Sequence, residues 1–137
     1  MLELLSDCEQ STMSLSDTYL ILSTASGDCY RTGLYILQAV LNGLGYRVIV
    51  LDGMDLAQFN QYMSDALCVG FVLSGLMKPS FDQFRVMVES VDGDKPLFIC
   101  GGGVRASFLA NLQLVYSGPI VGNRRSLLLV ESIINVF

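Results

Sequence analysis

The chain has 137 residues, of which 52% are hydrophobic and 15% charged, and its formal net charge is −5 at pH 7. This length and composition favour one domain with a well-buried core and exclude a disordered chain. An acidic chain whose largest basic cluster is Arg124-Arg125 does not suit a nucleic-acid surface. Its apolar runs are also too short to cross a membrane.

The N-terminal stretch, residues 1–17, is polar with a few leucines, and we expect an arm or a short helix there. It has neither a positively charged start nor a long apolar core, so it does not fit a secretory signal. We therefore expect a cytoplasmic protein whose domain proper covers residues 18–137.

Four cysteines, Cys8, Cys29, Cys68 and Cys100, are scattered along the chain without a Cys-x-x-Cys pair. We expect no disulfide framework, and we predict that Cys68 and Cys100, which fall in apolar runs, are small buried residues. The sequence contains no histidine. This argues against a zinc site of the usual four-ligand kind and excludes any mechanism that needs a histidine base or ligand.

The first strand is predicted at Tyr19–Leu22, where a continuous apolar run indicates burial on both faces. An amphipathic helix is predicted over Leu34–Leu44, and Gly45 suits its end. The inward face of this helix is expected to consist of Leu34, Leu37, Val40, Leu41 and Leu44.

Four more strands are predicted from apolar runs bounded by turn residues. These strands are Arg47–Leu51, Cys68–Leu73, Pro96–Cys100 and Leu114–Tyr116. Helices are predicted between them, and a last helix is predicted at Arg124–Phe137. Asp55, Ser80 and Asn123 are the residues expected to cap helices. The inward side chains of the middle helices are expected to be Leu56, Phe59, Met63 and Leu67, then Phe81, Phe84, Val88 and Val91, then Phe108, Leu109 and Leu112.

Strand and helix patterns alternate along the chain with linkers of a few residues, which is typical of parallel strands joined by crossover helices. Five such units in this length predict an α/β fold: a flavodoxin-like (Rossmann-like) doubly wound parallel sheet with strand order 2-1-3-4-5. In that order the first, third and fourth strands are neighbours.

Unusual residues follow these three neighbouring strands: Gly27-Asp28, Ser74-Gly75-Leu76 and Gly101-Gly102-Gly103. Parallel strands end at one edge of a sheet, so the three loops should converge at the switch point, where such sheets bind ligands. A tight turn alone explains any one of these glycines. Three converging loops favour a ligand site that the backbone approaches closely.

The residues alone leave the ligand open. Gly101–Ala106 fits the dinucleotide pattern G-x-G-x-x-A, but it follows the fourth strand and no acid lies about twenty residues on. Ser23–Gly27 is rich in hydroxyls, as are loops that bind a flavin phosphate, and a polar turn explains it equally. A phospho-receiver domain is excluded, because Ser74 and Gly118 stand where its aspartate and lysine belong.

Three segments together resemble the D-x-H-x-x-G, S-x-L and G-G motifs of cobalamin-binding domains. These segments are Asp28-Cys29-Tyr30-Arg31-Thr32-Gly33, Ser74-Gly75-Leu76 and Gly101-Gly102-Gly103. They occur in the family's order and at matching strand ends, and the resemblance covers residues 18–137. It implies the same five-stranded fold and a corrinoid cofactor held base-off.

The resemblance also implies roles for single residues. In the family, the cofactor's benzimidazole tail enters a cleft between the sheet and the first helix. By this resemblance Gly33 leaves room for the tail, Leu76 lines the cleft with Ser74, and Ser74 hydrogen-bonds the buried base. Gly101–Gly103 let the nucleotide loop approach the fourth strand, and Asp28 orients the residue beneath the cobalt.

The chain departs from the family at the cobalt-ligating histidine, because Tyr30 stands there. A phenol is a poor ligand unless it ionises, yet tyrosinate does ligate haem iron. Tyr30 is therefore either a metal ligand or a ring packed against the corrin or the loop. We expect a cobalamin-binding module, not catalytic on its own, that serves as a carrier, a sensor or a subunit. A protein partner is expected over the open upper face of the corrinoid.

Two alternatives stay open. The same scaffold suits a cofactor-free or haem-sensing regulatory domain. An FMN-binding flavodoxin-like protein is the less favoured alternative.

Overall fold

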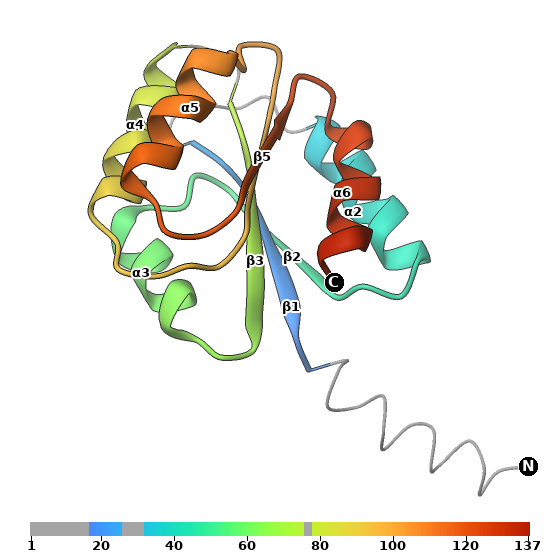
Figure 1. Cartoon of the computed structure of the whole chain (residues 1–137). Helices are drawn as coiled ribbons and strands as arrows, with labels where there is room; N and C mark the ends of the chain where they lie inside the picture. The colour runs from blue at the N-terminus through green and yellow to red at the C-terminus, as the bar shows by residue number, and fades with distance from the viewer. Residues whose placement is uncertain (1–16, 26–31, 76–77) are drawn as a thin grey trace, which may run out of the picture.

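The structure of the protein, a computed structural model, describes residues 17–25, 32–75 and 78–137. Strands and helices alternate along the chain (Figure 1). The elements are β1 (Tyr19–Thr24), α2 (Thr32–Gly43), β2 (Val48–Leu51), α3 (Leu56–Ser64), β3 (Cys68–Ser74), α4 (Lys78–Glu89), β4 (Leu97–Cys100), α5 (Ala106–Val115), β5 (Ile120–Asn123), the 3-10 turn η1 (Ser126–Leu128) and α6 (Leu129–Val136). The predicted arm lies outside the described residues, apart from Asp17.

The five strands form one parallel sheet in the order β2-β1-β3-β4-β5, which confirms the predicted fold class and strand order. The register runs straight across the middle of the sheet, where Ile21 pairs with Phe71 and Phe71 with Leu97. From β1 the chain first adds β2 on one side, and it then crosses to the other side of β1 to form β3, β4 and β5. The switch point is therefore at the carboxyl ends of β1 and β3.

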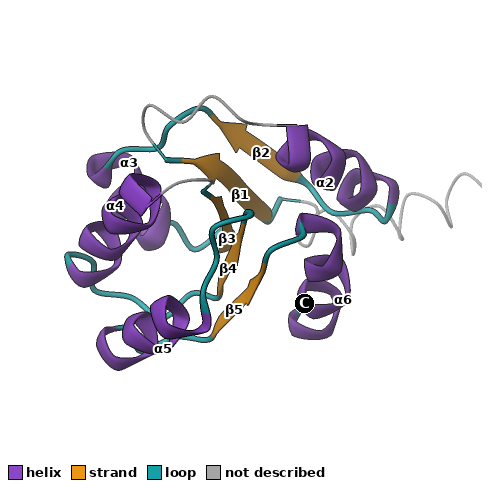
Figure 2. Ribbon diagram, turned by 90° about the horizontal axis from the view of Figure 1, so that it is seen from above, coloured by secondary structure: helices purple, strands orange, loops and turns teal. Residues whose placement is uncertain are grey.

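Helices cover both faces of the sheet (Figures 1 and 2). One face carries α3, α4 and α5, and the other carries α2 and α6. Alternate residues of each strand point to opposite faces, so the sheet supports two separate cores. The central strands β1, β3 and β4 have core residues on both faces, which is why they are almost continuously apolar in the sequence.

The two cores differ in composition. The core under α3, α4 and α5 is rich in aromatic rings, and those of Phe59 and Phe71 meet edge to face at a centroid distance of 4.8 Å. The core under α2 and α6 is built from aliphatic side chains around Phe98. Its buried leucines and isoleucine from the helices are Leu34, Leu37, Leu41, Leu129 and Ile133. The predicted burial of Cys68 and Cys100 is confirmed.

Local sequence signals define two helix ends as predicted. Asp55 begins α3 with a capping box, because its carboxylate accepts the Gln58 N–H at 2.8 Å while the Gln58 side chain accepts the Asp55 N–H at 3.0 Å. Gly45 follows the end of α2 with a φ of +94°. The Tyr46 N–H then donates to the Leu41 carbonyl, which is the closure that a left-handed glycine permits at a helix end.

The predicted fifth strand, Leu114–Tyr116, is wrong. Helix α5 continues to Val115, and the fifth strand of the sheet is Ile120–Asn123. The apolar run reflects the end of a helix: Leu112 and Tyr116 are buried four residues apart, while Leu114 is 85% exposed. Tertiary packing on the helical face overrides the short strand-like pattern.

Two predicted caps are also placed differently. Helix α4 begins at Lys78, so Ser80 lies inside its first turn and is buried rather than capping it. Asn123 is the last residue of β5, and its side chain accepts the Arg125 N–H at 3.0 Å as a cap would. A 3-10 turn follows, and α6 begins only at Leu129.

Four of the predicted inward side chains are exposed. They are Val40, Leu44, Leu56 and Leu67. Leu44 and Leu67 lie beyond the ends of α2 and α3, so neither side chain belongs to a helical face. Within the described ranges, no helix has both the length and the apolar character required to cross a bilayer.

On the face covered by α3 and α5, a network of polar contacts connects the amino-terminal ends of the strands. The Lys95 ammonium donates to the carbonyls of Asp65, at 2.7 Å, and Cys68. The Tyr116 hydroxyl donates to the Lys95 carbonyl, and the Tyr19 hydroxyl donates to the Asp65 carboxylate. The bond from Tyr19 is the main reason that the pKa of Asp65 lies below its usual value. These bonds join the starts of β1, β3 and β4 to one another.

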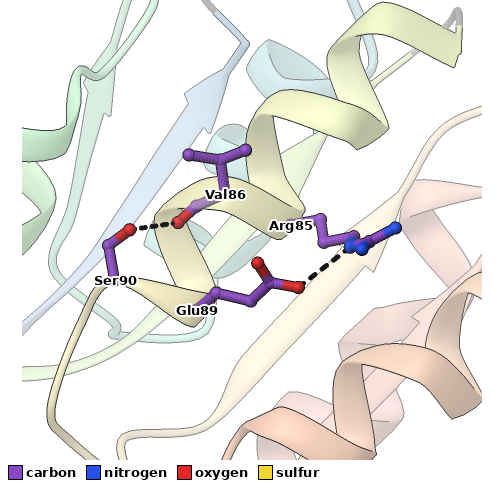
Figure 3. A network of polar contacts seen from close by, with 4 residues as sticks. All are labelled: Arg85, Val86, Glu89 and Ser90. Carbon is purple, nitrogen blue, oxygen red and sulfur yellow. Dashed lines mark hydrogen bonds and ion pairs between the residues drawn. The ribbon is translucent and has the colours of Figure 1, made fainter.

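Helix α4 ends in a smaller polar network on the surface (Figure 3). Arg85 and Glu89, one turn apart, form an ion pair at 2.9 Å, and the Ser90 hydroxyl donates to the Val86 carbonyl at 2.7 Å. The side chains are exposed, so water and salt screen the ion pair and it contributes little to stability. The network completes the helix end and has no residue suited to a ligand site.

We predict that Leu73→Ala lowers the free energy of unfolding by about 2–5 kcal/mol, because Leu73 is fully buried near the carboxyl end of β3 and its loss leaves a cavity. Chemical denaturation followed by circular dichroism measures the change. Leu114→Ala is the control, since that side chain lies in solvent, and it should change stability by no more than about 0.5 kcal/mol. Equal effects of the two substitutions would contradict this account of the core.

Candidate functional site

The candidate site begins with a row of residues at the carboxyl edge of the sheet. In register, Thr24 at the end of β1 pairs with Ser74 of β3, Ser74 with Cys100 of β4, and Cys100 with Asn123 of β5. These side chains are small or polar, whereas the residues before them in each strand are almost all apolar. The strands thus end together in a polar row, at the edge where sheets of this kind bind ligands.

The polar row belongs to the face covered by α2 and α6. Ser74 lies two residues after Val72 and Cys100 two after Phe98, and both apolar residues belong to the core under those helices. Since side chains alternate along a strand, Ser74 and Cys100 share that face. The first turn of α2 contains Thr32 and Gly33 and lies near the same edge of the sheet (Figures 1 and 2).

Ser74 and Cys100 form the centre of the row. The Ser74 hydroxyl is half-buried and hydrogen-bonds the Cys100 thiol. Burial raises the pKa of that thiol to about 11, although the bond from Ser74 lowers it somewhat. A thiol with such a pKa stays protonated at neutral pH, so Cys100 is neither a nucleophile nor a ready metal ligand. Ser74 is the member of the pair that can reach a ligand.

The loops after β3 and β4 touch through their backbones. The Gly75 N–H donates to the Cys100 carbonyl at 2.9 Å, and Gly101 has a φ of +126°. A Cβ on Gly101 would lie 1.7 Å from the Gly75 carbonyl oxygen, so a side chain is excluded there. Gly75 is itself enclosed by Ser80, Phe81 and Phe84 of α4. Packing within the protein therefore explains both glycines.

The remaining glycines of the second loop lie nearer to solvent. Gly102 is exposed and Gly103 is half-buried. The Val104 N–H closes the turn by donating to the Gly101 carbonyl at 3.2 Å. Arg124, from the segment after β5, donates its Nε–H to the Val104 carbonyl at 3.3 Å. This bond holds the loop after β4 against the loop after β5 and leaves Gly102 at its outer side.

The hydroxyls at the end of β1 are already engaged within the protein. The Ser23 hydroxyl accepts the Met54 N–H at 3.0 Å, and the Thr24 hydroxyl accepts the Gly53 N–H at 3.3 Å. Both side chains are buried, and together they hold the loop between β2 and α3. The Ser23 hydroxyl also donates to the Thr24 carbonyl at 2.8 Å, so this buried hydroxyl is fully used within the protein and is not available to a flavin phosphate. Ser26 and Gly27 lie outside the described residues.

The structure brings together part of the site predicted from the sequence. Ser74, Gly75 and Gly101–Gly103 meet at one edge, and Thr32 and Gly33 begin α2. Thr32 is exposed and Gly33 half-buried. Five predicted site residues lie outside the described residues: Asp28, Cys29, Tyr30, Arg31 and Leu76. The predicted roles of those five stay predictions.

Two members of the polar row, Cys100 and Asn123, were not predicted as site residues, and Thr24 was considered only as part of the Ser23–Gly27 stretch. A signal for them does exist in the sequence, since each closes an apolar run at a strand end. Within the part of the chain that the structure describes, no group of three or more cysteines and carboxylates is placed to hold a metal ion. The described residues thus offer hydrogen-bonding groups for an organic ligand and no metal centre.

Comparison with known proteins identifies the fold. No protein-family model matches the chain, and no curated protein matches it in sequence. Among solved structures, it is similar to a novel cobalamin-binding protein from Desulfitobacterium hafniense DCB-2, with a TM-score of 0.73 at 17% sequence identity. The match covers 88% of this chain and 59% of the other, so this chain spans less than two thirds of that protein. At this identity the likeness shows a shared fold.

We predict that Gly101→Ala strongly destabilises the protein, because the new Cβ would overlap the Gly75 carbonyl and φ is unfavourable for any other residue. The loss should exceed about 1–3 kcal/mol, the usual cost of such backbone strain alone. Urea denaturation measures it.

Gly43→Ala is the matched control. Gly43 ends α2 with open space around the position of a Cβ, so alanine should leave stability unchanged or raise it by up to about 1 kcal/mol. If Gly101→Ala were as stable as the wild type, the backbone contact between the two loops would not exist.

Proposed function

We propose that the chain is a cobalamin-binding module that holds the corrinoid base-off. The observation that carries the proposal is the place of Ser74 and Gly33 in the sheet order. The strand β3 that ends in Ser74 lies directly beside β1, and the segment that follows β1 leads into Gly33 at the start of α2. The two motif residues thus flank one switch point on the face of α2. The fold shared with a cobalamin-binding protein supports the same conclusion.

The described residues fit the tail of the cofactor. A benzimidazole nucleotide needs a hydrogen-bond donor for its base and little bulk along its path. The Ser74 hydroxyl is half-buried on the α2 and α6 face, and its strand neighbours in the row, Thr24 and Cys100, have short side chains. Gly33 adds no side chain in the first turn of α2. We infer that Ser74 binds the base and that the tail passes between Ser74 and Gly33, the partly exposed residues at this edge.

The described residues offer nothing for the lower side of the cobalt. The sequence has no histidine, so no protein imidazole can ligate from below. If the tail lies beside Ser74, its own base is unavailable as well. The lower position is then left to water, to no ligand, or to Tyr30 with Asp28 as its neighbour. When bound, a corrinoid would supply a cobalt centre able to carry an alkyl group.

A carrier, sensor or subunit follows from the same chemistry. The described part of the chain shows no metal-binding cluster and no activated thiol, since burial keeps both Cys68 and Cys100 protonated. The upper face of the corrinoid is left to a partner protein. The chain then presents the cofactor, and a partner supplies the reaction or reads the signal.

A cofactor-free regulatory domain is the second candidate, and one observation favours it. The contact between Gly75 and Gly101 requires glycine for packing alone, so part of the motif would persist without any ligand. Absorbance after desalting separates the candidates, with hydroxocobalamin, haem and flavin mononucleotide each added to the purified chain. Cobalamin alone should be retained, and retention of none of the three would favour the cofactor-free domain.

We predict that Gly33→Leu and Gly102→Leu each abolish hydroxocobalamin binding in equilibrium dialysis, because a bulky side chain would enter the path of the tail or of the nucleotide loop. Gly43→Leu is the matched control, since it lies at the far end of α2 and is exposed. All three variants should keep the wild-type circular dichroism. Wild-type affinity in both Gly33→Leu and Gly102→Leu would place the ligand elsewhere, and a wild type that retains no hydroxocobalamin would mean that it is not bound.

We also predict that the wild-type complex has the base-off absorbance spectrum at neutral pH, where free cobalamin is base-on. Tyr30→His should restore a nitrogen donor and shift the spectrum towards the six-coordinate form. Tyr35→His is the control, because residue 35 points to solvent from α2, and it should leave the spectrum unchanged.

The spectral experiment tests two separate claims, the position of the tail and the position of residue 30. A base-on wild-type complex would mean that the tail is not in the protein. An unchanged spectrum in Tyr30→His would remove only residue 30 from beneath the cobalt.

A further inference from the structure

The outer side of α2 is apolar and carries no charge. Residues 32–43 contain no lysine, arginine, aspartate or glutamate. Tyr35, Ile36 and Val40 nevertheless lie on its exposed side, and Tyr35 is 52% exposed. Helix α4 shows the contrast, since its outer side carries the ion pair of Arg85 with Glu89. A surface helix normally has a charged outer face, which α2 lacks, as do α3 and α5.

Further exposed apolar side chains lie on the C-terminal segment beside α2. Helix α2 contacts η1, which leads directly into α6, and α2 and α6 cover the same face of the sheet (Figures 1 and 2). Leu127, Leu128 and Ile134 are exposed there, Leu128 by 57%. We call the six side chains the α2/α6 patch: Tyr35, Ile36, Val40, Leu127, Leu128 and Ile134.

The α2/α6 patch is large enough for a stable interface. Six side chains of this size, each roughly half exposed, present apolar area on the order of 600 Å², at the upper limit for a monomeric protein. A standard interface buries about 800 Å² on each partner. In homodimers about 65% of that area is apolar. The patch therefore supplies the apolar part that one side of a homodimer interface requires.

Charge indicates that the occupant of the patch is a second copy of this chain. Two copies with a net charge of −5 each repel one another over most of their surface. Around the patch the balance is reversed, because Arg124 and Arg125 precede η1 and Glu131 is the sole charged residue of α6. A two-fold arrangement lets Arg125 of one copy face Glu131 of the other, while Arg124 donates to the Val104 carbonyl of its own chain. Electrostatic repulsion between two copies is therefore weakest when they meet through this side of the molecule.

We propose that the chain forms a two-fold symmetric homodimer through the α2/α6 patch. The interface is isologous, so each side chain of the patch is buried twice. It lies on the outer surface of the helices, away from the polar row that they cover, and its formation does not require a bound corrinoid.

Sedimentation velocity of the full chain without added cofactor tests the proposal. Over a concentration series, the wild type should approach twice the monomer mass of 15.0 kDa. Ile36→Glu and Leu128→Glu should each raise the dissociation constant of the dimer by about 100-fold or more, since each places a charge in the apolar patch twice. Both positions are exposed, so both variants should keep the wild-type circular dichroism and urea midpoint.

Leu114→Glu is the matched control. Leu114 is the most exposed large apolar side chain described, and it lies on α5, on the opposite face of the sheet. This variant should dimerise as the wild type does, and high salt should not dissociate the wild-type dimer, because the contact is mainly apolar.

Three results would overturn the proposal. They are a monomeric wild type throughout the series, a dimer that survives both Ile36→Glu and Leu128→Glu, and a dimer that salt or Leu114→Glu dissociates.

Discussion

The contact between the backbones of Gly75 and Gly101 is the constraint on which the carboxyl edge of this sheet depends. A Cβ on Gly101 would lie 1.7 Å from the Gly75 oxygen, so a side chain has no room there, and the Gly75 N–H is bonded to the Cys100 carbonyl. The loops after β3 and β4 therefore leave the sheet together. Helices α4 and α5 start from these loops, and their closeness allows Phe81 and Phe108 to meet at a centroid distance of 5.1 Å.

The two faces of the sheet differ in how their cores are built. The α3, α4 and α5 face holds most of the buried rings described and the hydrogen bonds of Lys95, so its core is tightly specified. The α2 and α6 face holds mainly aliphatic side chains, and its upper end is the row that contains Ser74 and Asn123. A ligand on this face would displace little aromatic packing.

Periodicity in the sequence was sufficient to predict the parallel sheet, its strand order and the burial of residues such as Leu37 and Ile99. It failed at Leu114–Tyr116, because three apolar residues fit a strand as well as a helix end, and the choice depends on which side chains the core accepts. It failed at Ser80 for a related reason: the residue is buried against Gly75, and nothing local records that contact. The motif at Ser74 was found by resemblance, whereas Thr24, Cys100 and Asn123 needed the register.

Much of the motif at this edge is required for packing within the protein. Residues of this kind are weaker evidence for a bound ligand than residues that packing does not require. The hydroxyls of Ser23 and Thr24 hold the loop between β2 and α3, and Gly101 is required by Gly75. Such residues persist in a scaffold whether or not it binds a cofactor. A ligand is better argued from residues that packing leaves accessible, and the half-buried Ser74 hydroxyl is the clearest of these. It lies beside the switch point and hydrogen-bonds the Cys100 thiol, so a ligand at this edge would have to share or replace that bond.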